Sequence, residues 1–172
     1  MSQGIHCEIE RKYLIRRPEL AALLSLPSCE RWEITQIYLT DGEGGLTRRV
    51  RRVVCDGQIR YFRTFKRRLS ALSCQEDEAE ITREEYDRLR AAADLSRNPI
   101  LKTRCRVPHA GRVLEFDLYP FWTDRAILEI ELESEDEQPA LPDYVSVIRD
   151  VTGEKAYKNR QLAKRVPMEE IG

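Results

Sequence analysis

Apolar and polar residues alternate along most of the chain, and this period of two is typical of strands with one face against a core. The alternation predicts eight strands, over residues 6–14, 33–39, 46–54, 59–67, 76–81, 99–107, 112–119 and 126–133. Asp56-Gly57, between the third and the fourth, has the composition of a type I′ hairpin turn. The Gly-rich segment 41–45 and the segment 108–111 predict two further tight connections.

Apolar residues at helical spacing occur in four shorter segments, residues 18–26, 82–93, 143–151 and 158–166. The second begins with Thr82 and Glu85 at the spacing of a capping box. The 172 residues contain no repeat and no long linker, which predicts a single domain over 1–172. We expect an α+β fold, mostly β, with about four flanking helices. The strands would form a barrel over about 5–134, followed by a C-terminal helical segment over about 142–167.

Charges of one sign recur on single faces of the predicted strands, because residues i and i+2 of a strand share a face. Glu8 and Glu10 do so in the first strand, and Lys102 and Arg104 in the sixth. Like charges in such rows repel, so the rows need a neutralising partner. Closing the eight strands into an antiparallel barrel with the charged faces inward would bring both signs into one tunnel. The cations expected inside are Lys12, Arg49, Arg51, Lys66, Lys102, Arg104 and Arg106, and the anions are Glu8, Glu10, Glu78, Glu80, Glu115, Asp117, Glu129, Glu131 and Glu133.

The facing of the third strand stays open at this point. Arg49 and Arg51 share one face, whereas Arg48 and Arg52 flank Val50 on the other. Whichever pair points inward, the apolar faces would point outward and be covered by the helices. A cavity rich in charge suits a polyanion, since Arg and Lys match phosphate oxygens, together with a divalent metal held by carboxylates.

Composition narrows the class of protein further. Lys and Arg number 29 against 30 Asp and Glu, so the formal net charge of −1 argues against a general nucleic-acid binder. Hydrophobic residues make up 41%, which argues against disorder. No apolar run approaches the roughly 20 residues that cross a bilayer, and we expect a cytoplasmic protein with no membrane partner. The five cysteines form no CxxC pair and are expected to be reduced thiols.

Several motifs of the chain match one known family. Glu8-Ile9-Glu10-Arg11-Lys12 has the ExExK form, and seven further pieces follow in order at strand spacing. They are Arg49-Val50-Arg51, Thr64-Phe65-Lys66, Glu78-Ala79-Glu80, Lys102-Thr103-Arg104, Glu115-Phe116-Asp117, Glu129-Ile130-Glu131 and Tyr157-Lys158-Asn159. Over nearly its whole length the chain resembles the CYTH superfamily, also called triphosphate tunnel metalloenzymes, and most of all its short bacterial inorganic triphosphatases. The resemblance implies an eight-stranded tunnel that binds a triphosphate with a divalent metal.

Roles for individual residues follow from this resemblance. It implies that Glu8, Glu10, Glu129 and Glu131 hold Mg²⁺ or Mn²⁺. It implies that the phosphates are bound by the basic residues Arg49, Arg51, Lys66, Lys102 and Arg104. Three further residues are expected to act in catalysis. Lys12 would hold phosphate or orient Glu10, and Glu115 and Asp117 would hold a second metal or its water. Glu78 and Glu80 would orient the cations, and the segment around Tyr157–Asn159 would close one tunnel end.

The expected reaction is hydrolysis of inorganic tripolyphosphate to pyrophosphate and phosphate, so the expected partner is a small triphosphate-containing molecule. Three alternatives stay open: a class IV-type adenylate cyclase, a thiamine triphosphatase, and a non-catalytic module that binds polyphosphate or nucleotide. RNA binding through the basic window 46–68 is disfavoured, because half of its basic residues alternate into the proposed tunnel. The oligomeric state, with a dimer as one possibility, is not determined by the sequence.

Overall fold

The computed structural model describes residues 2–172, with side chains from residue 5 onward. Its strands are β1 (Ser2–Arg16), β2 (Glu30–Tyr38), β3 (Thr47–Cys55), β4 (Gln58–Arg68), β5 (Ser73–Ile81), β6 (Ile100–His109), β7 (Arg112–Leu118), β8 (Arg125–Glu131) and β9 (Val147–Asp150). Its helices are α1 (Leu20–Leu24), α2 (Arg83–Arg90) and α3 (Asn159–Leu162), with short 3₁₀ turns at Glu43–Gly45 and Lys155–Tyr157. None of the helices within residues 2–172 has the length and apolar character needed to cross a bilayer.

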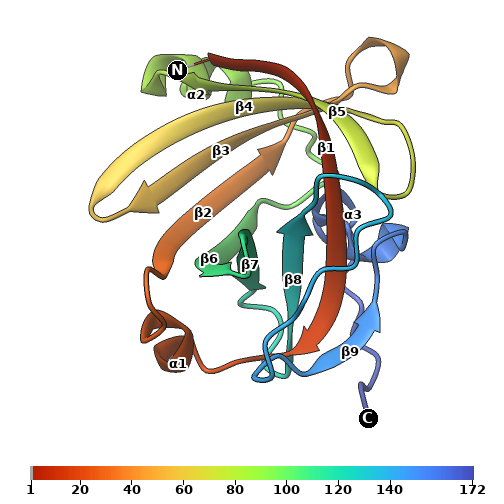
Figure 1. Cartoon of the computed structure of the whole chain (residues 1–172). Helices are drawn as coiled ribbons and strands as arrows, with labels where there is room; N and C mark the ends of the chain where they lie inside the picture. The colour runs from red at the N-terminus through yellow and green to blue at the C-terminus, as the bar shows by residue number, and fades with distance from the viewer. Residues whose placement is uncertain (1) are drawn as a thin grey trace.

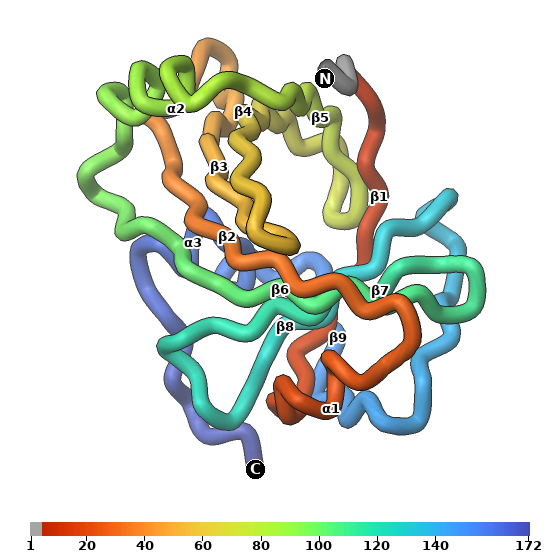
Figure 2. Tube along the Cα trace, turned by 90° about the vertical axis from the view of Figure 1, so that its left-hand side faces the viewer, coloured from red at the N-terminus to blue at the C-terminus, as the bar shows by residue number. Residues whose placement is uncertain are grey.

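Eight of the strands close into an antiparallel barrel, as predicted. The hydrogen-bonded order is β5-β4-β3-β2-β6-β7-β8-β1, and β1 also pairs with β5. The long strand β1 makes this closure, because its residues 2–9 pair with β5 and its residues 10–16 pair with β8. Figure 1 shows β1 running from the upper layer of β3, β4 and β5 down past β8, and Figure 2 shows the same layers from the side.

Two tight hairpins follow from residues that adopt left-handed backbone angles. Asp56 and Gly57 have φ of 50° and 74°, the type I′ turn that their composition predicts. Ala110 and Gly111 repeat this arrangement, with φ of 49° and 76°. The second turn is shorter than the predicted segment 108–111, because β6 continues through Pro108 to His109.

The apolar faces of the barrel point outward and are covered by the segments that the barrel leaves free. On one side Phe116 and Cys105 pack against Leu23 of α1, so Cys105 lies outside the tunnel. On another side Trp122 packs with Tyr157 of the C-terminal segment. The helix α2 covers β3 and β4 through contacts of Tyr86 in a third cluster. Most of the hydrophobic core therefore lies in outer layers around a polar interior. A small cluster of Ile34, Val53 and Phe62 is the exception, because it lies on the strand faces that also line the cavity.

The predicted C-terminal helices are where the structure differs most from expectation. The helix predicted over residues 143–151 is wrong, because Val147–Asp150 is the strand β9 and pairs with β1. β5 stops pairing with β1 at Ile9, so the edge of β1 beyond it needs another partner for its backbone groups. The β-branched pair Val147-Ile148 suits that strand. The helix predicted over 158–166 is shorter, with only residues 159–162 helical.

The helix α2 offers a test of local stability. The Thr82 hydroxyl oxygen accepts from the amide of Glu85 at 3.1 Å, and the Glu85 carboxylate accepts from the amide of Thr82 at 3.0 Å. We expect Thr82→Ala to lower the free energy of unfolding by about 1 kcal/mol, because one orphan amide loses its acceptor. Thermal unfolding should show a decrease in Tm of about 2–4 °C. Thr82→Ser keeps the acceptor and serves as the control; an equal loss in both variants would contradict the capping role.

Candidate active site

The barrel encloses a cavity of about 410 Å³ whose lining is mostly charged. All seven cations expected inside line it, together with six of the expected anions, Glu8, Glu10, Glu78, Glu115, Glu129 and Glu131. The facing of β3 is also resolved, since Arg49 and Arg51 point into the cavity. Arg48 lies on the opposite face and donates from Nε to the Thr40 carbonyl at 3.0 Å.

Three of the nine expected interior anions do not line the cavity: Glu80 and Glu133 lie outside it and Asp117 lies beneath its lining, and one interior anion was missed. The carboxylate of Glu80 accepts from Arg60 Nη2 at 2.7 Å. At Glu80 the strand β5 already extends beyond the end of the cavity. Glu133 follows the end of β8 and is exposed, so the strand alternation no longer decides its direction. Glu76 does line the cavity. Extending the alternation of Glu78 back by two residues would have found it.

A buried carboxylate holds two of the cations in place. Asp117 has no exposed surface and lies beneath the lining. Its oxygens accept from Lys102 Nζ at 2.8 Å and from Arg104 Nε and Nη2 at 2.7 and 2.9 Å. Burial raises the pKa of Asp117, but the two cations outweigh burial and hold the pKa below its ordinary value. Because both oxygens are engaged, the geometry favours a role in orienting Lys102 and Arg104 over binding a metal.

The four glutamates proposed as metal ligands lie on neighbouring strands. Glu10 of β1 is opposite Glu131 of β8, and Lys12 is opposite Glu129. Burial and the charge of Glu129 raise the pKa of Glu10 to about 7, and burial raises the pKa values of Glu131 and of the nearby Glu8. In these carboxylates burial and the charges of neighbouring glutamates outweigh the nearby cations, such as Lys66 beside Glu8, which leaves a deficit of positive charge. A set of hard oxygen donors with this deficit fits a divalent cation such as Mg²⁺ or Mn²⁺.

Glu129 differs from the other three glutamates because cations already surround it. Lys12 Nζ lies 3.2 Å from its Oε1 and Arg104 Nη2 lies 3.3 Å from its Oε2. Burial raises the pKa of Glu129, but Lys12 and Arg104 outweigh burial and place the pKa well below its ordinary value. Glu129 therefore joins the glutamate group to the cationic half of the tunnel.

The arginines of β3 carry donors without acceptors. Arg51 Nη2 donates to Glu78 at 2.9 Å, and the same carboxylate oxygen accepts from the hydroxyl of Thr64. Within the described residues, however, the buried Nε of Arg49 and the buried Nε of Arg51 have no hydrogen-bond partner. An unpaired buried donor costs about 1–3 kcal/mol, so both groups favour an anionic ligand.

Three further cations join the lining to which the sequence analysis gave no role. Arg68 lies at the end of β4, and Lys158 and Arg160 come from the C-terminal segment. Burial and the charge of Arg68 lower the pKa of Lys158 to about 8. Asn159 also lines the cavity, so the expectation that the segment around Tyr157–Asn159 closes one end agrees with its position. Lys158 and Asn159 belong to the quoted motif Tyr157-Lys158-Asn159, whereas no local pattern marks Arg68 or Arg160.

Asp117 makes a sharp test of this charge network. We expect Asp117→Asn to lower the free energy of unfolding by about 3–5 kcal/mol, because two buried cations lose their counter-charge. Glu154→Gln is the matched control, since Glu154 pairs with Arg149 at 2.7 Å in an exposed position and should contribute about 0–1 kcal/mol. Urea unfolding of both variants measures the difference. Equal small losses would contradict the anchoring role of Asp117.

Comparisons with known proteins agree with this architecture. No protein-family model and no curated protein matches the chain. Among solved structures, the inorganic triphosphatase NE1496 is 28% identical to this chain and superposes with a TM-score of 0.54. The match covers 94% of this chain and 97% of the NE1496 chain. The PH1819 protein of Pyrococcus horikoshii is 17% identical with a TM-score of 0.57, over 75% and 80% of the two chains.

A third structure comes from Hippeastrum and is named as a candidate adenylyl cyclase, HpAC1, with a dominant triphosphatase activity. It is 17% identical with a TM-score of 0.51, over 73% of this chain and 80% of its own, and so bears on the fold alone. The closed antiparallel barrel, its charged interior and these similarities lead to one conclusion. This chain has the triphosphate tunnel fold of the CYTH superfamily and resembles its short bacterial triphosphatases.

Proposed function

We propose that this protein is a metal-dependent triphosphatase that hydrolyses inorganic tripolyphosphate to pyrophosphate and phosphate inside the tunnel. The observation that carries the proposal is the charge of the lining. Ten basic and seven acidic side chains face the cavity, although the chain as a whole has a net charge of −1. A positively charged cavity inside a slightly acidic protein is suited to a compact polyanion. The similarity to the inorganic triphosphatase NE1496 over nearly both full chains supports the same class of substrate.

The lining also favours an inorganic substrate over a nucleotide. The aromatic side chains that face the cavity within the described residues are Trp32 and Tyr38. The guanidinium of Arg106 lies 4.6 Å from the centre of the Trp32 ring and covers one face of it. Tyr38 is almost fully buried and accepts a hydrogen bond from Gln36 at 2.6 Å. Tyr38 therefore offers no face on which a base would stack, and Trp32 offers at most one.

The basic side chains would bind and orient the triphosphate. Arg49 and Arg51 each offer a buried donor without an acceptor, and Lys102 and Arg104 are fixed by Asp117. Phosphoryl transfer depends mostly on positioning and charge stabilisation, so a rigid set of donors is its main requirement. As the bond from the terminal phosphorus to the bridging oxygen breaks, negative charge grows on the leaving pyrophosphate, and these cations stabilise it. A water oxygen forms the new bond, and the reaction needs no covalent nucleophile.

A divalent cation is the expected cofactor. Glu8, Glu10, Glu129 and Glu131 would hold it, and it would supply Lewis acidity towards water and phosphate oxygens. Lys12, at 3.2 Å from Glu129, would keep that carboxylate oriented and balance part of the charge of the group. Glu115, which accepts from Arg104 and Arg106 at 3.2 and 3.1 Å, would set the position of both guanidiniums.

Product analysis on the purified chain tests the reaction. Tripolyphosphate, ATP and thiamine triphosphate are offered separately with Mg²⁺ or Mn²⁺, and phosphate, pyrophosphate and cyclic AMP are quantified. We expect phosphate and pyrophosphate from tripolyphosphate, little product from ATP, and full loss of turnover in excess EDTA that either metal restores. Cyclic AMP with pyrophosphate from ATP would instead establish a cyclase. No turnover of any substrate would leave a binding module.

The metal ligands are tested by charge-removing variants. Glu10→Gln and Glu129→Gln should each lower tripolyphosphate hydrolysis by about 100-fold or more, because even outer-sphere partners of a metal contribute 10–100-fold. Circular dichroism checks that both variants are folded, which matters for Glu129 because it neutralises Lys12 and Arg104. Glu133→Gln is the control, since this exposed residue lies outside the cavity and should leave the rate within about twofold. Wild-type rates in both ligand variants would refute the assignment.

A further inference from the structure

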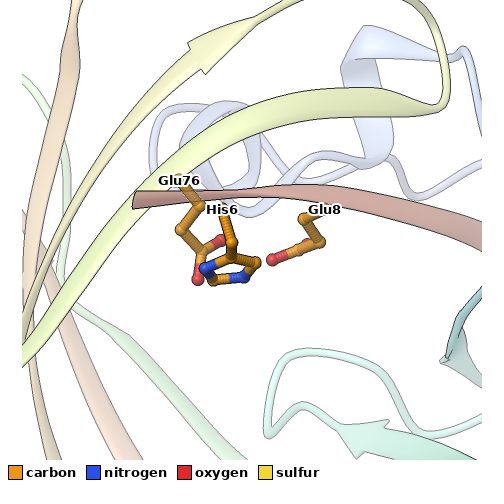
Figure 3. A group of neighbouring side chains, drawn as sticks. All are labelled: His6, Glu8 and Glu76. Carbon is orange, nitrogen blue, oxygen red and sulfur yellow. The ribbon is translucent and has the colours of Figure 1, made fainter. Parts of the chain in front are cut away.

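A second group of metal-ligating side chains lies in the tunnel beside the four glutamates. His6 and Glu8 extend from β1 and Glu76 extends from β5, and the three point toward one another (Figure 3). Their ligand atoms, one from each residue, all lie within 4.8 Å of one another. The register of the sheet fixes this arrangement, because His6 is the direct partner of Glu76 across the β1–β5 ladder.

The spacing suits a single ion. Three atoms within 4.8 Å of one another lie at most about 2.8 Å from a common centre. Each therefore needs to move by at most about 0.6 Å to reach the distance of about 2.1–2.2 Å at which metals bind such ligands. Glu76 is 5% exposed, and its carboxylate lines the cavity. Its Oε2 accepts no hydrogen bond from the described residues and has Lys66 Nζ as a charge neighbour at 3.1 Å.

The local charge also leaves room for a cation. Glu8, Glu76 and the neighbouring Glu10 carry three negative charges. Lys66, 3.5 Å from Glu8 Oε1, and Arg49 balance two of them, which leaves one uncompensated. The imidazole of His6 adds a nitrogen donor. One imidazole with two carboxylates is a donor set that transition metals prefer, whereas Mg²⁺ prefers oxygen donors alone.

We propose that His6, Glu8 and Glu76 form a binding site for a transition-metal dication, at which Mn²⁺, Co²⁺ and Zn²⁺ bind in preference to Mg²⁺. The site shares Glu8 with the four-glutamate group but draws its other two ligands from outside it. His6 is therefore the residue that decides which metal the tunnel accepts at this position. The proposal concerns ligation, so it stands or falls independently of the hydrolysis proposed above.

The sequence provides a clean experiment because the chain has only two histidines, His6 and His109. His109 lies at the end of β6 and does not line the tunnel cavity. Pulsed EPR of the full-length chain loaded with Mn²⁺ detects a directly bound imidazole nitrogen through its modulation of the electron spin echo. We expect this nitrogen signal in the wild type and in His109→Gln, and its loss in His6→Gln.

Affinity measurements complete the test. By titration calorimetry, His6→Gln should lower the affinity for Mn²⁺ by at least about tenfold and change the affinity for Mg²⁺ little, and Glu76→Gln should also weaken Mn²⁺ binding by at least about tenfold. Glu10→Gln, which removes a ligand of the four-glutamate group only, should keep the nitrogen signal.

The proposal is overturned if Mn²⁺ binds the wild type without a nitrogen signal, if it does not bind, or if the signal survives in His6→Gln. Loss of the signal in Glu10→Gln would overturn the separation of the two sites. Hydrolysis of tripolyphosphate that persists in any of these cases would leave the proposed function intact.

Discussion

The neutralisation of charge inside the barrel is the constraint on which the rest of this structure depends. Each buried ion costs several kcal/mol unless a partner of opposite sign compensates for it. The tunnel meets this requirement with shared pairs, of which Asp117 between Lys102 and Arg104 is the most enclosed. Because the interior is given to charge, the apolar faces of the strands must point outward. The short helices and the C-terminal segment then become necessary, since they are what covers those faces.

The strand β1 links these requirements. It carries Glu8, Glu10 and Lys12 into the tunnel on one face, and its edges pair with β5, β8 and β9. The change of partner along β1 places Glu8 near the β5 residue Glu76 and Glu10 opposite the β8 residue Glu131. One strand therefore supplies carboxylates to two neighbouring clusters. A shift of its register by one residue would send every one of these side chains to the outer face.

Alternation along single strands was enough to predict the barrel and most of its interior, because the side-chain period of a strand is fixed by backbone geometry. It failed where a strand ends or leaves the cavity, as at Glu133 and Glu80. It also failed where the decisive partner is distant in sequence. The segment 147–150 forms a strand because β1 offers an open edge, and Arg160 lines the tunnel because the outer apolar cluster holds the C-terminal segment against the barrel. Such tertiary causes leave no mark on the local pattern.

The position of Lys66 would connect the proposed metal site with the proposed phosphate site. Its ammonium lies between Glu8 and Glu76, at 3.5 and 3.1 Å. Burial and the charge of Arg49 lower the pKa of Lys66, but the glutamates outweigh them and raise it above its ordinary value. A dication that takes these two carboxylates replaces the counter-charge that Lys66 supplies to them. The ammonium would then lose its partners and need a new anion, and the proposed triphosphate would supply one in the same cavity. Binding of the proposed metal and of the proposed substrate would therefore favour each other through this one lysine.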